Sequence, residues 1–179
     1  MPYTGLKQTK MIYFTSDLHA FHKNIIEYDK WKFNSLEEYR DFIIYTWNKT
    51  ISSDDEVYLL GDTCVGGRTG DIKNFLWSLN GKIYLVKGNH EKEIIKVNHL
   101  KSRFEWIKDY HVTDSEKQRL VLMHYPIEEW INKSHGSIHL HGHSHGNSRQ
   151  VKNRIDVGFS ACNGVIYNID EIISMKNRI

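Results

Sequence analysis

The chain has 179 residues, with 24 lysines and arginines against 22 aspartates and glutamates, which gives a net charge of +2. A composition of 40% apolar and 26% charged residues excludes a disordered or collagen-like chain and predicts one globular domain over residues 1–179. The near-neutral charge argues against binding to extended nucleic acid. Two cysteines, too few for a disulfide framework, and the lack of a long apolar run predict a cytoplasmic protein with no membrane contact.

Short apolar runs alternate with amphipathic segments through the first half of the chain. Apolar runs of about four residues are typical of buried strands, and apolar residues at helical spacing predict helices between them. Strands that alternate with helices pair in parallel through right-handed crossovers. The predicted strands are residues 11–14, 57–60 and 83–86, and the predicted helices begin at Lys23, begin at the capping residue Ser35, or span residues 71–79 and 91–100.

The second half of the chain is predicted to be mostly β. A polar segment at residues 113–116 separates two predicted strands and reads as a turn. The chain is therefore an α/β protein whose helices lie mainly in its first half. The predicted strands of the second half are residues 106–112, 119–124, 138–141 and 154–157.

Carboxylate, imidazole and amide side chains follow five of these strands at the point where each strand ends. Ligands of open α/β sheets bind beyond the carboxyl ends of the strands, so these side chains are candidates for one site. Asp-x-His and His-x-His pairs address one cavity, because residues i and i+2 of an extended chain point the same way. Such nitrogen and oxygen ligands suit Mn, Fe, Zn, Ni or Co ions. The candidates are Asp17, His19, Asp62, Asn89, His90, His124, His143 and His145, which include five of the 11 histidines.

The order of these motifs resembles the calcineurin-like metallophosphoesterase superfamily from Asp17 to His145. The motifs are Asp-x-His, Gly-Asp, Gly-Asn-His-Glu, a single His, and Gly-His-x-His. The early Ser-Asp-x-His and His-Lys-Asn-Ile-Ile runs are similar to those of small single-domain bacterial and phage members. The resemblance implies two mixed β-sheets packed as a sandwich and flanked by helices (αββα), with two divalent metal ions at the carboxyl ends of the strands.

The resemblance also implies a role for each candidate. Asp62 would bridge the two ions, and hydroxide formed between them would attack phosphorus. His90 would lie beside the ions without binding them. It would either give a proton to the leaving oxygen, which typically contributes ~10²–10⁴-fold to a rate, or contact the phosphoryl group. Mn²⁺ is the expected metal, with Fe, Zn, Ni or Co as alternatives. The ligands implied for one ion are Asp17, His19 and His145, and those implied for the other are Asn89, His124 and His143.

Several residues near the motifs are candidates for a further role. Glu91 stands where the family more often has aspartate, and its extra methylene is expected to alter the orientation of His90. His141 continues the His-x-His pattern but lies outside the signature, and it is expected to be buried and hydrogen-bonded. The candidates for substrate contact are His22, Arg68 and Tyr125.

The spacing of the motifs bears on the substrate. About 33 residues separate His90 from His124, and 18 separate His124 from His143, which leaves no room for a cap domain. An open site of this kind suits small phosphodiesters, including nucleotide-like ones. Three alternatives stay open: a phosphomonoesterase, a hydrolase of another bond that uses the same metals, and a non-catalytic binding or scaffold module on the same fold. The sequence does not define the native metal or the oligomeric state.

Overall fold

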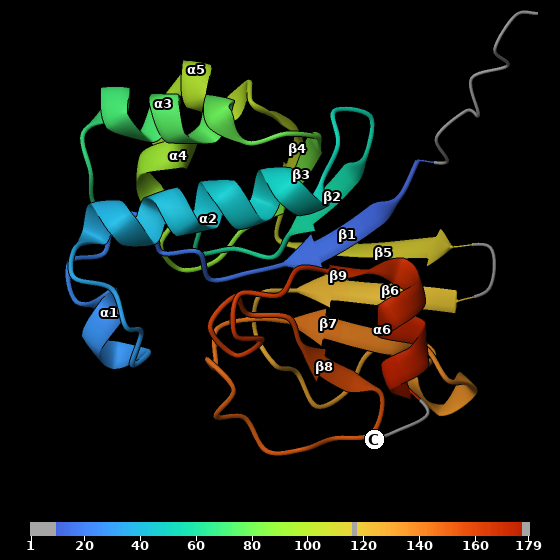
Figure 1. The fold of residues 1–179 in the computed structure, drawn as a ribbon. Helices are drawn as coiled ribbons and strands as arrows, with labels where there is room; N and C mark the ends of the chain where they lie inside the picture. Colours follow the sequence, from blue (N-terminus) through green and yellow to red (C-terminus); the bar gives the residue numbers. More distant parts are fainter. Residues whose placement is uncertain (1–9, 116–117, 177–179) are drawn as a thin grey trace, which may run out of the picture.

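The computed structural model describes residues 10–115 and 118–176 (Figure 1). Its strands are β1 (Ile12–Thr15), β2 (Glu56–Leu59), β3 (Lys82–Val86), β4 (Phe104–Lys108), β5 (Tyr110–Ser115), β6 (Gln118–Met123), β7 (Ile138–His141), β8 (Arg154–Asp156) and β9 (Tyr167–Asn168). Its helices are α1 (Ile25–Tyr28), α2 (Leu36–Thr50), α3 (Thr69–Ser78), α4 (Lys92–Lys96), α5 (Asn98–Lys101), α6 (Ile169–Lys176) and the 3₁₀ turn η1 (Lys133–His135).

The strands form two mixed sheets, which confirms the predicted architecture. The first sheet has the order β4-β3-β2-β1-β9, and the second has the order β5-β6-β7-β8. Strands β1 to β4 pair in parallel, and β9 runs antiparallel to β1. In the second sheet, β5 is antiparallel to β6, whereas β6, β7 and β8 are parallel. Helices α2 to α5 lie on one side of the first sheet, and the second sheet lies on its other side (Figure 1).

Successive side chains of a strand point to opposite faces of the sheet. The first sheet therefore contributes to two hydrophobic cores, one beneath the helices and one between the sheets. In β2, Val57 and Leu59 face the helices, whereas Tyr58 and the following Leu60 face the second sheet. Trp47 of α2 is fully buried in the core beneath the helices. A strand buried on both sides needs apolar side chains on both faces, which is why its apolar residues form a continuous run. The core between the sheets includes Phe14, Val86, Leu120, Leu122, Leu140, Val157 and, from α6, Ile172.

The predicted start of α2 is confirmed. Ser35 is extended and accepts a hydrogen bond from the Glu38 amide at 3.1 Å. Glu38 reaches back to the Asn34 amide at 2.8 Å, one residue before the cap. This pairing satisfies amides at the start of the helix that no helical carbonyl can reach.

Three predictions about local structure were wrong. The single helix predicted over residues 91–100 is interrupted at the β-branched Val97, which is extended and separates α4 from α5. The strand predicted over 106–112 breaks at Asp109, where the chain passes from the first sheet to the second, so β4 and β5 belong to different sheets. Most of the predicted turn at 113–116 belongs to β5, because Thr113, Asp114 and Ser115 pair with β6. Glu116 lies outside the described residues.

Three further features complete the description of the fold. The sequence analysis predicted neither β9 nor α6. The two residues of β9 are too few to show a periodicity. Within residues 10–115 and 118–176, the helices are too short or too polar to cross a bilayer. Cys64 and Cys162 are both buried and unpaired.

Candidate metal centre

The polar residues after the strands gather at one end of the sandwich. Figure 1 shows the arrowheads of β1, β6 and β7 pointing the same way, with α1 at that end of the molecule. A parallel bridge between Ser16 and Gly158 joins the segments that follow β1 and β8. The carboxyl ends of strands from both sheets therefore meet, and the residues predicted from the strand ends lie within reach of one another.

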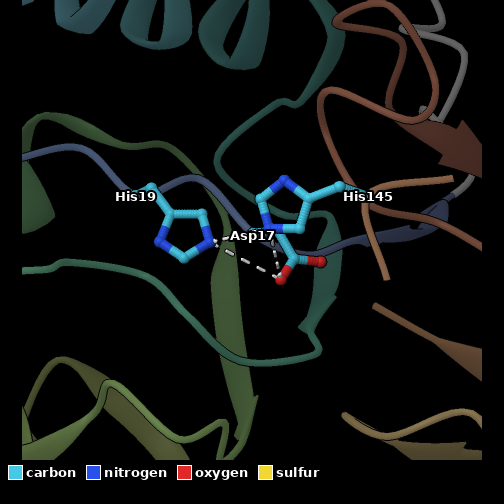
Figure 2. A group of neighbouring side chains, drawn as sticks. All are labelled: Asp17, His19 and His145. Atoms are coloured by element: carbon cyan, nitrogen blue, oxygen red, sulfur yellow. Dashed lines mark hydrogen bonds and ion pairs between the residues drawn. The ribbon is translucent and has the colours of Figure 1, made fainter. Parts of the chain in front are cut away.

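Asp17, His19 and His145 form the first group, and their ligand atoms all lie within 4.8 Å of one another. His19 Nε2 is 3.8 Å and His145 Nε2 is 3.9 Å from the same oxygen, Asp17 Oδ1. Figure 2 shows both rings turning a nitrogen toward the Asp17 carboxylate. The two Nε2 atoms are 3.2 Å apart. Asp17 itself is held from behind, since both of its oxygens accept the His143 amide, at 3.1 and 2.9 Å.

Asp62, His124 and His143 form the second group, which also meets the 4.8 Å limit. The amide oxygen of Asn89 joins it, at 3.0 Å from His124 Nε2 and 3.1 Å from His143 Nδ1. The first group and this one contain the seven residues for which the sequence predicted a metal-binding role. The structure places Asp17, His19 and His145 in one group, and Asp62, Asn89, His124 and His143 in the other.

One oxygen of Asp62 lies between the groups. Oδ2 is 3.7 Å from His19 Nε2 and 3.5 Å from His124 Nε2. Burial alone raises the pKa of Asp62, but the hydrogen bond and charge of His124 and the charge of His19 outweigh it, so the pKa is lowered. Asp62 therefore stays a carboxylate that faces both groups.

The backbone of the site is held in an uncommon conformation. Residues other than glycine rarely adopt positive φ, and residues that do so cluster at functional sites. Gly142 shows how closely the segments approach, because an added Cβ would overlap Ser16 Oγ and Asp17 Oδ2. Five of the nine described non-glycine residues with positive φ are candidate ligands: Asp17, His19, Asp62, His143 and His145.

The ligand atoms fit a cation. His124 Nδ1 is 2.8 Å from the Leu60 carbonyl oxygen, which can only accept, so Nδ1 carries the ring proton. Nε2 of the neutral ring then presents a lone pair toward the oxygens of Asn89 and Asp62. A positive charge must therefore lie among these atoms. In the metal-free site it is a proton on Nε2, because burial lowers the pKa of His124 but the hydrogen bond and charge of Asp62 outweigh it and raise the pKa; a bound cation would take the place of that proton. In the first group, His19 Nδ1 is buried without a hydrogen-bond partner in the described structure.

Burial disfavours the charged forms of Asp17 and His19. It raises the pKa of Asp17 to about 7 and lowers the pKa of His19 to about 3. Both shifts oppose the charged form, as expected for groups removed from water. A bound divalent cation would be the largest local charge and would favour the Asp17 carboxylate. The nitrogen and oxygen set, which lacks thiolate, suits Mn, Fe, Zn, Ni or Co.

His90 lies beside the two groups. Its backbone amide donates to Asp62 Oδ1 at 3.0 Å, and its exposed ring is centred 5.7 Å from the His19 ring. Glu91 is buried, and its carboxylate accepts the Thr63 amide at 2.7 Å and the Gly88 amide at 2.6 Å. The longer side chain thus joins the ends of β2 and β3, and the described structure contains no hydrogen bond between it and the His90 ring.

Replacing Glu91 with glutamine is expected to lower the free energy of unfolding by about 2 kcal/mol. The amide has one acceptor oxygen, so its NH₂ group would face the Thr63 or the Gly88 amide, donor against donor. Urea denaturation of the metal-free protein measures the change. Glu93→Gln, on the exposed face of α4, is the control and should be near neutral. An equal effect of the two substitutions would contradict the role of Glu91.

The three candidates for substrate contact differ in position. The ring of Tyr125, which is 39% exposed, lies edge-on to His143 and His124 at centroid distances of 4.7 and 5.0 Å. His22 lies beside the first group, with its ring 5.9 Å from that of His19. Arg68 precedes α3 and pairs with Asp71 at 2.9 Å. Tyr125 and His22 therefore contact the two ligand groups, whereas Arg68 contacts α3.

Two supporting residues follow from the tertiary structure. His141 is buried, and its Nδ1 lies 2.8 Å from the Gly142 carbonyl oxygen, as the sequence predicted in outline. His139 is also buried; its Nδ1 donates to the Val121 carbonyl at 3.0 Å and its Nε2 accepts the Ile127 amide at 3.3 Å, which holds the loop after β6. Burial lowers the pKa of His139 to about 4, so the ring is neutral in the folded protein at neutral pH.

Asp29 was not predicted, and it contacts a candidate ligand directly. Its Oδ1 lies 2.8 Å from His145 Nδ1. It lies 12 positions after Asp17, within the segment between β1 and α2, and belongs to none of the motifs. Only the folded chain brings it to His145.

Comparison with known proteins finds one matching family model and several similar sequences. The family model described as calcineurin-like phosphoesterase matches residues 10–150. An uncharacterized protein of Methanocaldococcus jannaschii is 30% identical over 139 residues, covering 77% of this chain and 71% of that protein. The gene 66 protein of Mycobacterium phage L5 is 28% identical over 197 residues, covering 93% of this chain and 94% of that protein.

Solved structures show the same fold. A protein of unknown function from Aquifex aeolicus superimposes with a TM-score of 0.75 at 26% sequence identity, covering 93% of this chain and 99% of that one. An archaeal phosphodiesterase superimposes with a TM-score of 0.50 at 17% identity, covering 89% and 98% of the two chains. At that identity, the likeness to the phosphodiesterase concerns the fold alone.

Proposed function

Because the chain belongs to the calcineurin-like phosphoesterase family, we propose that it is a binuclear metal-dependent phosphoesterase that hydrolyses small phosphodiesters. The observation that carries the proposal is the position of Asp62 Oδ2, 3.7 Å from His19 Nε2 and 3.5 Å from His124 Nε2. A single carboxylate oxygen between two sets of ligand atoms suits a pair of adjacent cations that share one ligand. Two-metal sites of this kind are typical of phosphatases and nucleases.

Each group of residues would hold one divalent ion, with Asp62 shared between them. The first would be held by Asp17, His19 and His145, and the second by Asn89, His124 and His143. Such ions, when bound, lower the pKa of water and neutralise charge on the phosphoryl oxygens. We propose Mn²⁺ as the metal, with Fe, Zn, Ni or Co as alternatives that the same ligand types accept.

His90 is the proposed proton donor to the leaving oxygen. Its exposed ring lies beside the first group, and the hydrogen bond from its backbone amide to Asp62 keeps the residue next to the ligands. A proton held on the ring would pass to the leaving oxygen as its bond to phosphorus breaks. This removes the need to expel an unprotonated alkoxide, which is the role of a general acid.

The proposed substrate is a small phosphodiester, including nucleotide-like ones, bound in an open site without a cap domain. Tyr125 supports an aromatic substituent, because its partly exposed ring lies against His143 and could stack on a base. His22 is proposed to contact the substrate on the side of His19, and Arg68 to contact it only if it leaves Asp71. The net charge of +2 supports a small ligand over an extended nucleic acid. Two buried, unpaired cysteines support a reducing compartment such as the cytoplasm.

The test compares bis(p-nitrophenyl) phosphate, p-nitrophenyl phosphate and p-nitrophenyl acetate as substrates with added Mn²⁺. We expect the diester to be hydrolysed with the highest kcat/KM, EDTA to stop the reaction, and Mn²⁺ to restore it. Elemental analysis should find two ions per chain. Preferential hydrolysis of the monoester would replace the diester assignment. Two bound ions without hydrolysis of any substrate would favour a binding or scaffold module.

A further inference from the structure

Asp29 lies behind the first group of ligands, away from the second. It follows α1, and its side chain is 6% exposed. Oδ1 is 2.8 Å from His145 Nδ1, although the two residues are 116 positions apart in the sequence. The segment that carries Asp29 projects at the end of the sandwich where the ligands gather (Figure 1).

The contact determines which nitrogen of His145 is free. A carboxylate only accepts hydrogen bonds, so His145 Nδ1 must carry the proton that Asp29 accepts. Nε2 of the neutral ring then keeps its lone pair. This atom is 3.9 Å from Asp17 Oδ1 and 3.2 Å from His19 Nε2, and so it faces the other members of the first group.

The remaining neighbour of His145 Nδ1 does not determine the tautomer. Ser160 Oγ lies 3.3 Å away, and a hydroxyl can donate or accept. With serine alone, the ring could carry its proton on either nitrogen. A ring protonated on Nε2 would direct N–H instead of a lone pair toward the first group.

The position of Asp29 is itself determined by the local fold. Its amide donates to the Ile25 carbonyl at 3.0 Å, and Ile25 is buried in the core. Two residues later, the Trp31 ring packs against the rings of Tyr39 and Phe159. The carboxylate therefore comes from an anchored segment.

We infer that Asp29 is a positioning residue, whose hydrogen bond holds His145 in the tautomer and orientation that present Nε2 to a cation in the first group. The inference rests on the proposed function, because it assumes that this group binds a metal. Carboxylates in this position behind a histidine ligand typically contribute 10–100-fold to metal affinity. The segment between β1 and α2 is thus part of the metal site, although it lies outside the motifs.

The experiment uses Asp29→Asn in the full chain, with Glu27→Gln as the matched control. Both substitutions replace one carboxylate by its amide, and Glu27 is exposed in α1, two residues before Asp29. Long-range ¹H–¹⁵N NMR of the metal-free protein gives the protonation of the His145 ring, and calorimetry with Mn²⁺ gives the affinity of each site. In Asp29→Asn we expect a mixed tautomer and one site weakened about 10–100-fold. The other site and both sites of Glu27→Gln should be unchanged.

A double-mutant cycle separates positioning from a general loss of stability. In a His145→Ala background, Asp29→Asn should change Mn²⁺ affinity less than about twofold, because the ring on which it acts is gone. A full effect in that background, equal weakening of both sites, or two unchanged sites would overturn the inference. So would a neutral wild-type His145 without a proton on Nδ1, a measurement that needs no variant. If wild type binds no Mn²⁺, the proposed function fails, and the NMR comparison still decides whether Asp29 sets the tautomer.

Discussion

Replacing Asp62 with asparagine is expected to weaken both metal sites together and to lower kcat/KM by about 10³-fold, equivalent to about 4 kcal/mol. Asp62 uses both oxygens, since Oδ1 accepts the His90 amide and Oδ2 faces His19 and His124. Asparagine has one acceptor oxygen and no charge. If that oxygen keeps the His90 amide in place, an NH₂ group faces the two cation positions.

Metal content by elemental analysis and Mn²⁺ titration measure this effect, with diester hydrolysis as the functional readout. Asp54→Asn, an exposed carboxylate in the turn before β2, is the matched control and should leave both sites intact. His124→Ala should empty mainly the second site, because its ring lies 3.0 Å from Asn89 and faces that group. Selective loss of one ion in Asp62→Asn would show that Asp62 does not bridge the sites.

Replacing His90 with alanine is expected to lower kcat by about 10²–10⁴-fold while both ions stay bound. None of the contacts within the two groups involves the His90 ring, and its backbone amide remains available to Asp62 after substitution. The loss should depend on the leaving group. A p-nitrophenolate leaves readily without a proton, whereas an alkoxide does not, so a dialkyl diester should suffer more than a nitrophenyl diester.

Steady-state rates on the two classes of diester, together with metal content, test this role. His99→Ala, an exposed histidine on α5, is the control and should match the wild type on both substrates. An equal loss on both diesters would indicate that His90 contacts the phosphoryl group and does not act as the acid. Full activity on the dialkyl diester would remove His90 from the reaction.

The candidate ligand residues could be picked out from the sequence because their positions follow from local sequence. A strand of four apolar residues ends where polar residues begin, and the polar residues after parallel strands meet at one edge of a sheet. Asp17 and Asp62 are examples, because each follows a buried strand that pairs in parallel with its neighbour. The same reasoning located His124 and His143 beyond the second sheet.

Other predictions failed where local sequence carries no information about partners. The break at Asp109 could not be predicted from periodicity, because a run of strand-forming residues does not show which sheet each part pairs with: β4 pairs in the first sheet and β5 in the second. The sequence predicted that Glu91 alters the orientation of His90, but the contacts of its carboxylate depend on which segments lie nearby in the fold. In the folded chain it reaches the amides of Thr63 and Gly88, two segments that only the pairing of β2 and β3 brings together.

The sequence by itself determined the chemistry of the site: which residue types follow the strands, and in what order. Those properties are local, because apolar runs and the residues that end them are contiguous in the chain. Only the tertiary structure decided how Asp62 faces both groups and how Asp29 supports His145. Contacts between residues 116 positions apart depend on how the segments pack, and no spacing within the sequence encodes them.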